Sequence, residues 1–131
     1  MKQARNPESV HAPTGRYVHQ IEVSAEHRML FISGQVGMEP GGDVPPETTA
    51  QFEVALANVM ANVEAAGFAP TDVVKLVTYV VDSTDMNPAD RRAVLDQTFG
   101  DHVTASTLVY VSRLAAPQYL VEIDAWAVKA D

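Results

Sequence analysis

Apolar residues recur at two different spacings along the chain, and these spacings predict both helices and strands. From Glu47 to Ala66 they recur three and four positions apart, which is typical of a helix with one buried face. The apolar positions of this segment are Phe52, Leu56, Val59, Met60 and Val63. Thr48 or Thr49 is placed to cap the start of this helix, and Gly67 is placed to end it.

Shorter segments are rich in apolar and β-branched residues and are bounded by turn residues, which is the pattern of strands. These segments are Tyr17–Val23, Met29–Ile32, Val73–Asp82, Ser106–Leu114 and Tyr119–Lys129. A second helix is predicted to begin at Asn87 or Asp90 and to run to about Thr98. The order of these elements predicts an α+β fold, with two helices and a mixed sheet of five to six strands.

The chain of 131 residues has the length of one domain, and no stretch has the composition of a linker between domains. Residues 1–131 are therefore predicted to form a single domain. The first 14 residues contain Pro7 and Pro13 among scattered polar residues and are expected to be a loose arm. Gly34 follows a predicted strand and marks a place where the backbone bends or a ligand comes close.

The predicted helices are few for the number of strands. Two helices cover only one face of such a sheet, whereas the segment Val73–Asp82 carries apolar residues on both of its faces. A large uncovered apolar face is typical of a subunit interface. We therefore predict a homo-oligomer in which the sheet of each copy packs against a neighbour.

The last predicted strand places two carboxylates on a face that does not resemble a solvent face. Glu122 and Asp124 alternate with apolar residues and share their side of the strand with Leu120, Trp126 and Val128. An interface that contains a polar pocket explains both kinds of residue. Glu122 either pairs with a nearby lysine or arginine, as buried carboxylates usually do, or acts as an acid, a base or a ligand anchor.

Composition and charge narrow the classes of function. The chain has 9 basic and 17 acidic residues and a net charge of −8, which argues against general nucleic-acid binding and against an anionic membrane surface. It has no cysteine, so disulfides and thiolate chemistry are excluded. We expect no signal peptide and no membrane-spanning segment, and we expect a cytoplasmic location.

The other chemical motifs are weak. The four histidines lack the spacing of metal ligands, so no metal site is predicted. Ser33 and Ser106 lack a local signature of a serine nucleophile. Gly41 and Gly42 lack the fingerprint of a phosphate-binding loop.

Five runs of residues, taken together and in this order, resemble the Rid family, the YjgF-type reactive intermediate deaminases. These runs are residues 30–35 (LFISGQ), 62–67 (NVEAAG), 72–75 (DVVK), 111–114 (VSRL) and 121–125 (VEIDA). The resemblance extends from about Gly15 to the end of the chain. It implies a chorismate-mutase-like fold, a homotrimer and three clefts between subunits that bind small carboxylates. It also implies hydrolysis of enamines and imines, such as 2-aminoacrylate, to 2-oxo acids and ammonia without metal or cofactor.

The resemblance carries site residues onto this chain one by one. Tyr17 is implied to line the cleft, Ser33 and Gly34 to bring backbone close to the ligand, and Glu122 to position the attacking water. The family's arginine, which grips the substrate carboxylate, corresponds to Ser106 here. Losing that bidentate contact weakens substrate binding by about 2–4 kcal/mol, or roughly 30- to 1000-fold, so efficient 2-aminoacrylate deamination is not expected.

Other residues are candidates to bind the substrate, since Ser106 carries no positive charge. Arg91 and Arg92 lie on the second predicted helix, and Arg92 is taken as a substrate-binding candidate; the alternative is an arginine that faces solvent. Tyr110 shares a strand face with Ser106 and either lines the cleft or packs in an interface. Arg113 matches an arginine that the family also has there, which favours a structural role.

Two functions of different classes remain open at this point. The first is hydrolytic deamination of an enamine, imine or related small metabolite other than 2-aminoacrylate. The second is a non-catalytic protein that binds a metabolite or a partner at the same clefts. Ribonuclease activity, which the resemblance also raises, is disfavoured by the charge of −8.

Overall fold

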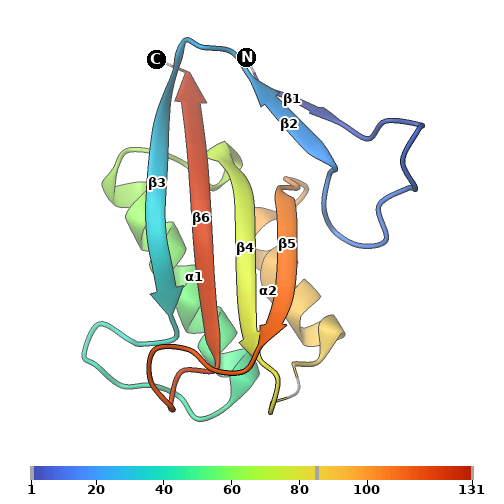
Figure 1. The fold of residues 1–131 in the computed structure, drawn as a ribbon. Helices are drawn as coiled ribbons and strands as arrows, with labels where there is room; N and C mark the ends of the chain where they lie inside the picture. The colour runs from blue at the N-terminus through green and yellow to red at the C-terminus, as the bar shows by residue number, and fades with distance from the viewer. Residues whose placement is uncertain (1, 85, 131) are drawn as a thin grey trace.

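The computed structural model describes residues 2–84 and 86–130. In chain order it contains β1 (Lys2–Arg5), β2 (Gln20–Val23), β3 (His27–Val36), α1 (Thr48–Ala65), the short 3-10 helix η1 (Pro70–Asp72), β4 (Val73–Val81), α2 (Pro88–Phe99), β5 (Ala105–Val111) and β6 (Val121–Ala130). Figure 1 shows their arrangement. The two α-helices and the strands confirm the predicted α+β class.

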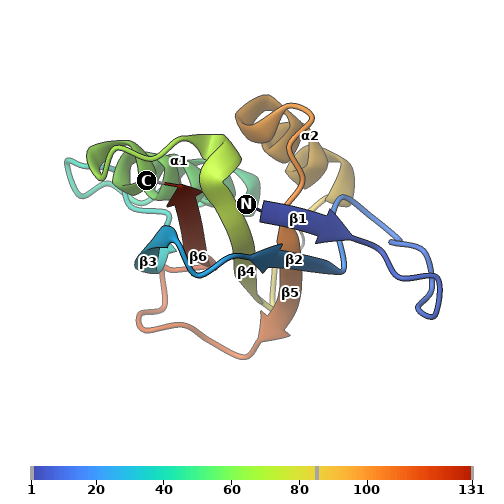
Figure 2. The ribbon, with the colours of Figure 1, turned by 90° about the horizontal axis from the view of Figure 1, so that it is seen from above.

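Four strands form the main sheet, in the order β3-β6-β4-β5. The β6 strand is antiparallel to both β3 and β4, whereas β4 and β5 are parallel and are connected through α2. Both α-helices lie on the same side of this sheet, as Figure 2 shows from above. The prediction of two helices on one face is therefore confirmed.

The six strands are divided between two sheets, whereas we expected one. The β1 and β2 strands pair only with each other among the described residues, in a separate two-stranded sheet. The segment Lys2–Arg5 lies in the expected loose arm, and that expectation is wrong for these residues. The Lys2 ammonium holds them in place, since it donates to Asp72 Oδ1 at 3.2 Å and to the Val128 carbonyl at 3.0 Å.

The ends of the helices follow local chemistry. The N-cap of α1 is Glu47, and the Thr48 hydroxyl bonds to the Thr84 hydroxyl, so the predicted threonine cap is wrong. Gly67 has a φ of +79°, the left-handed conformation that suits glycine after a helix, as predicted. The α2 helix is capped by Asn87, whose Oδ1 accepts from the Ala89 N–H at 2.9 Å.

The core lies between the sheet and α1. Apolar side chains of this helix are almost fully buried against the inward face of β4 and β6. The residues that meet there include Phe52, Leu56, Val59, Val63, Leu76, Val80, Val121 and Ile123. In the part of the chain that the structure describes, no helix is long and apolar enough to cross a membrane.

The opposite face of the main sheet is open and partly apolar. Phe31 on β3 is 67% exposed, Met29 is 58% exposed, and Val109 on β5 is 39% exposed. Trp126 pairs in register with Phe31, so its half-buried side chain shares this face. The predicted alternation of β6 is confirmed, because Val121, Ile123, Ala125 and Ala127 are buried in the core under the helices.

Candidate functional site

A bulge in β3 brings backbone against the carboxylates of β6. The pairing of β3 with β6 shifts register between Ile32 and Gln35, so Ser33 and Gly34 fall outside the regular ladder. A β-carbon at position 34 would collide with the Glu122 carboxylate, lying 2.7 Å from its Cδ. The absence of a side chain at Gly34 therefore lets the Glu122 carboxylate lie directly against this bulge.

The environment of Glu122 disfavours the charged form of its carboxyl group. Burial raises the pKa of Glu122 above its usual value, and the neighbouring charge of Asp124 raises it further. Among residues 2–84 and 86–130, no lysine or arginine forms a salt bridge with Glu122. Within one copy of the described chain, the expected alternative of an ion-paired Glu122 is therefore not observed.

Asp124 is held in place by a tyrosine of the next strand. The Tyr79 hydroxyl donates to Asp124 Oδ2 at 3.2 Å. The charge of Asp124, burial, this hydrogen bond and the charge of Glu122 all raise the pKa of Tyr79, so its phenol stays protonated. Asp124 thus has a partner of its own, whereas the Glu122 carboxylate is left for another group.

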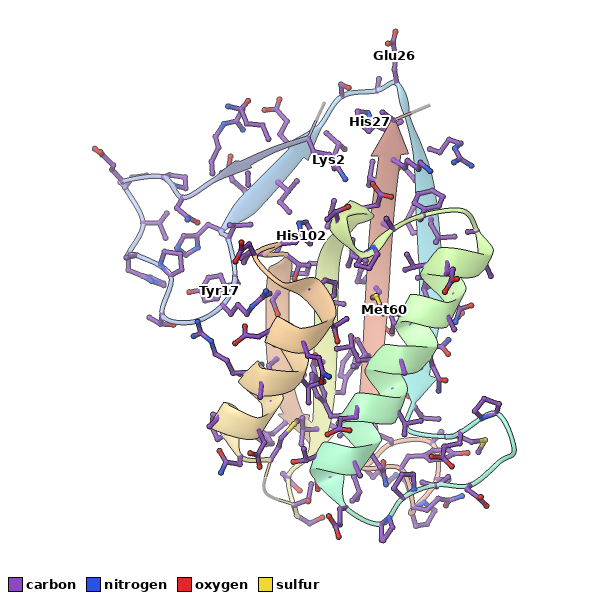
Figure 3. The ribbon with its side chains drawn as sticks, turned by 180° about the vertical axis from the view of Figure 1, so that it is seen from behind. Lys2, Tyr17, Glu26, His27, Met60 and His102 are labelled. Carbon is purple, nitrogen blue, oxygen red and sulfur yellow. The ribbon has the colours of Figure 1, made fainter. Side chains whose placement is uncertain are left out.

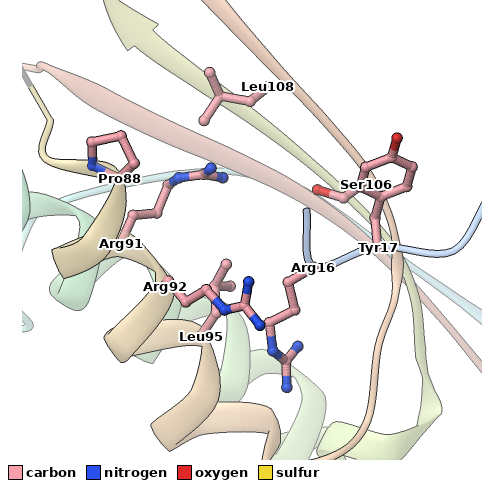
Figure 4. Close-up of a pocket in the computed structure, with 8 residues that line it drawn as sticks. All are labelled: Arg16, Tyr17, Pro88, Arg91, Arg92, Leu95, Ser106 and Leu108. Atoms are coloured by element: carbon pink, nitrogen blue, oxygen red, sulfur yellow. The ribbon is translucent and has the colours of Figure 1, made fainter. Parts of the chain in front are cut away.

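A second group of candidate residues surrounds a cavity of about 320 Å³ between α2, β5 and the segment before β2. Its lining residues are Arg16, Tyr17, Pro88, Arg91, Arg92, Leu95, Ser106 and Leu108. Figure 4 shows them around the cavity, and Figure 3 shows Tyr17 beside α2. Three of the eight are arginines, in a chain whose net charge is −8.

Of the three arginines, Arg16 is the one that other described residues hold firmly. Arg16 donates from Nε to Asp96 Oδ1 at 2.7 Å, it also bonds to the Gly100 carbonyl, and its side chain is only 9% exposed. Arg92 lies 3.9 Å from the same carboxylate, and its side chain is 61% exposed. For Arg91, the described residues contain no salt-bridge partner.

Tyr17 presents its phenol at the edge of the cavity. The Thr14 N–H donates to the Tyr17 hydroxyl at 3.2 Å, and hydrogen bonding with Thr14 lowers the pKa of the phenol. The ring packs edge-on against His19, with 5.4 Å between the ring centres. The segment before β2 thus positions Tyr17 by contacts within itself.

The predicted site residues fall into two groups on opposite faces of the main sheet. Ser106 pairs in register with the buried Leu76 and faces the helices, whereas Glu122 pairs with Tyr79 on the open face. Tyr17, Ser106 and the predicted Arg92 share the cavity, while Ser33, Gly34 and Glu122 share the bulge. Tyr110 is 56% exposed and is not among the residues that line the cavity.

Sequence reasoning missed several residues of these two groups. Arg16 was not a candidate, although it directly precedes Tyr17. Tyr79 lies in the segment Val73–Asp82, which was predicted only as a strand with apolar residues on both faces, and its hydrogen bond to Asp124 depends on β4 lying next to β6. Leu95 follows Arg91 by four positions on α2, a spacing that places both on one side of the helix and could have indicated the cavity.

The described residues offer no evident site for a metal ion. Within residues 2–84 and 86–130, no three His, Asp or Glu side chains are grouped so that they could hold one. The two groups of side chains place a carboxyl group of raised pKa on one face of the main sheet and a cationic cavity on the other.

Comparisons with known proteins agree on one family. A family model described as endoribonuclease L-PSP matches residues 8–129. A 2-iminobutanoate/2-iminopropanoate deaminase of Escherichia coli is 35% identical over 126 residues, which cover 93% of this chain and 94% of the relative.

Solved structures show the same fold. A protein of unknown function of the Rid family from Yersinia pestis superimposes with a TM-score of 0.79 at 32% identity, over 96% of this chain and 97% of the other. The structure of Escherichia coli TdcF with bound serine has a TM-score of 0.69 at 29% identity, over 98% of this chain and 99% of the other.

Proposed function

This chain belongs to the Rid family, and from that premise we propose that it hydrolyses the C=N bond of a small imine or its enamine tautomer. The observation that carries the proposal is Glu122, whose carboxyl group has a raised pKa and no salt-bridge partner among the described residues. A carboxyl group of that kind is suited to moving a proton during hydrolysis. The deaminase relative of Escherichia coli supports this reaction class.

We further propose that the active site is a cleft between copies of the chain in a homotrimer. Glu122 and the arginine cavity face away from each other within one copy, so a single copy does not bring them together. The exposed Met29 and Phe31 lie on the same face as Glu122, and an apolar face of this kind favours burial against a neighbour. Each cleft would then join Glu122 of one copy to the cavity of the next.

The proposed reaction needs only water and proton transfer. The Glu122 carboxylate accepts a proton from water while the water oxygen forms a bond to the imine carbon. The protonated carboxyl group returns that proton to nitrogen, which gives a carbinolamine. The carboxylate then accepts the hydroxyl proton and delivers it to nitrogen, so that the C–N bond breaks, the C=O bond forms and ammonia leaves. Water and imine are consumed, and one ammonia and one carbonyl compound are produced.

The substrate proposed for this chain differs from 2-aminoacrylate. Ser106 lines the cavity at the position where the resemblance places an arginine, and a neutral hydroxyl cannot grip a carboxylate bidentately. The net charge of −8 favours a small metabolite over RNA, because RNA affinity depends on an excess of basic residues.

Ammonia release from a panel of imines, generated in the assay from amino acids by an oxidase, tests the proposal. We expect turnover of at least one imine by the protein, and a loss of turnover of about 100-fold or more in Glu122→Gln, with the oligomer intact by sedimentation. If no imine is turned over while small molecules still raise the melting temperature, the non-catalytic binding function replaces the proposed one.

A further inference from the structure

We propose that the cavity between α2 and β5 is a binding site for a doubly charged oxyanion, in which Arg91 and Arg92 hold the ligand and Arg16 is a fixed support. The identification of this oxyanion as part of the substrate rests on the proposed function. The binding itself is a property of one copy, because all eight lining residues belong to the same chain.

The charge balance of the cavity indicates the charge of the ligand. The lining contains three arginines and no acidic residue, and among the described residues the carboxylate that forms ion pairs with them is Asp96, which contacts Arg16 and Arg92. Three positive charges and one negative charge leave a surplus of 3 − 1 = +2. A dianion neutralises this surplus, whereas a monocarboxylate leaves half of it.

The three arginines are not equivalent. Arg16 is committed to Asp96 and to the Gly100 carbonyl, and its guanidinium lies 6.0 Å from the centre of the Phe99 ring. The 3.9 Å contact of the exposed Arg92 with Asp96 is long, and exposed ion pairs of this kind contribute little to stability. With respect to the described residues, Arg91 and Arg92 therefore keep most of their hydrogen-bonding capacity for a ligand.

The position of Arg91 is that of a ligand-binding side chain. It is half-buried, and in Figure 4 it extends from α2 toward Leu108 on β5. Apolar walls reduce the solvation of a cation, so a guanidinium placed among Pro88, Leu95 and Leu108 gains more from an anionic partner than one in open solvent. The planar guanidinium also suits bidentate binding of a carboxylate or a phosphate.

This arrangement accounts for Ser106. The cationic group on α2 takes the place of a charge on β5, and the small hydroxyl leaves room between strand and helix for a larger ligand. The substrate class is therefore a small imine that carries two negative charges away from the reacting carbon. Two acidic groups or one phosphate both meet this description.

Calorimetric titration at low ionic strength tests the site with three probes: pyruvate, 2-oxoglutarate and inorganic phosphate. We expect a dianion to bind at least tenfold more tightly than pyruvate, and 0.5 M NaCl to weaken that binding, since salt screens charge. Tighter binding of 2-oxoglutarate than of phosphate indicates a dicarboxylate ligand, and the reverse order indicates a phosphate ester. Equal affinity for pyruvate and both dianions overturns the proposal.

Substitutions locate the bound anion. Arg91→Gln is expected to weaken dianion binding at least tenfold and Arg92→Gln several-fold, with Arg91→Lys between Arg91→Gln and the parent protein. Arg5→Gln removes the same charge from β1, outside the cavity, and is expected to leave binding unchanged. Dianion binding that survives Arg91→Gln, or that falls equally in Arg5→Gln, contradicts the assignment.

The same titration separates this proposal from the proposed function. Glu122→Gln is expected to abolish turnover and to retain dianion binding, because Glu122 lies on the other face of the sheet. Dianion binding without turnover of any imine supports the oxyanion site and refutes the hydrolytic function. Turnover of an imine without preference for dianions supports the hydrolytic function and refutes the oxyanion site.

Discussion

The structure predicts that Gly34→Ala lowers the activity strongly and changes the stability of the fold little. The new β-carbon would collide with the Glu122 carboxylate, at 2.7 Å from Cδ, and would lie 3.0 Å from Asp124 Oδ1. Carbon atoms in contact are about 3.5–4.0 Å apart, so the Glu122 carboxyl group must move by about 1 Å. A shift of this size in a reacting group reduces the rate by about 100-fold.

The same substitution has little effect on folding. The atoms that must move are the ends of two side chains, and Gly34 does not have the positive φ that would strain alanine. Alanine also restricts the unfolded chain, which offsets part of the steric cost. We therefore expect the free energy of unfolding, measured by urea denaturation, to stay within about 1 kcal/mol of the parent value.

Ammonia release and urea denaturation, measured on the same preparations, test the predicted loss of activity and the predicted retention of stability. Gly41→Ala is the matched control, because a β-carbon there meets nothing within 4 Å. In a Glu122→Gln background, Gly34→Ala should cause no further loss of activity, since the group it displaces is already gone. Full activity in Gly34→Ala, or a loss of activity that merely follows a loss of stability, would refute the placement of Glu122 at the bulge.

Two further predictions concern Glu122 and Ser106. The pKa of Glu122 is raised in the folded protein, so folding favours the neutral carboxyl group. Once the pH exceeds about 4.5, the pKa of this group in the unfolded chain, its ionisation destabilises the folded state. Glu122→Gln should therefore raise the melting temperature at pH 7, with the gain disappearing below about pH 4; a gain that is the same at both pH values contradicts the shift. Ser106→Arg adds a guanidinium to the cavity and should increase kcat/KM for 2-aminoacrylate relative to Ser106→Gln; equal values would show that more than this side chain excludes that substrate.

The elements with a strong local pattern were predictable from the sequence. The spacing of Phe52, Leu56 and Val63 predicted α1, because helical periodicity and burial on one face are the same property. Asn87, one of the two residues predicted to begin α2, is its N-cap, and this was predictable because a capping side chain acts on the N–H groups next to it. The alternation around Glu122 predicted its face, since neighbouring residues of a strand point in opposite directions.

Features that depend on distant contacts were not predictable in this way. The short polar strand β1 has no pattern of its own, and three hydrogen bonds from Lys2 to residues far along the chain hold it in place. Gly34 was predicted as a place where the backbone bends or a ligand comes close, whereas the Glu122 carboxylate that lies against it is set by the pairing of β3 with β6. Arg16 joins the cavity only because Asp96 and Gly100 lie at the end of α2.

The central claim is that Glu122 of one copy acts on a ligand held in the cavity of another. Mixing two inactive variants tests it: Glu122→Gln, and Ser106→Glu, whose new carboxylate would occupy the arginines of the cavity. After the two are unfolded and refolded together in equal amounts, about a quarter of the clefts in randomly assembled trimers combine an intact Glu122 with an intact cavity. The account predicts recovery of about a quarter of the parent activity. A mixture no more active than either variant alone would contradict it.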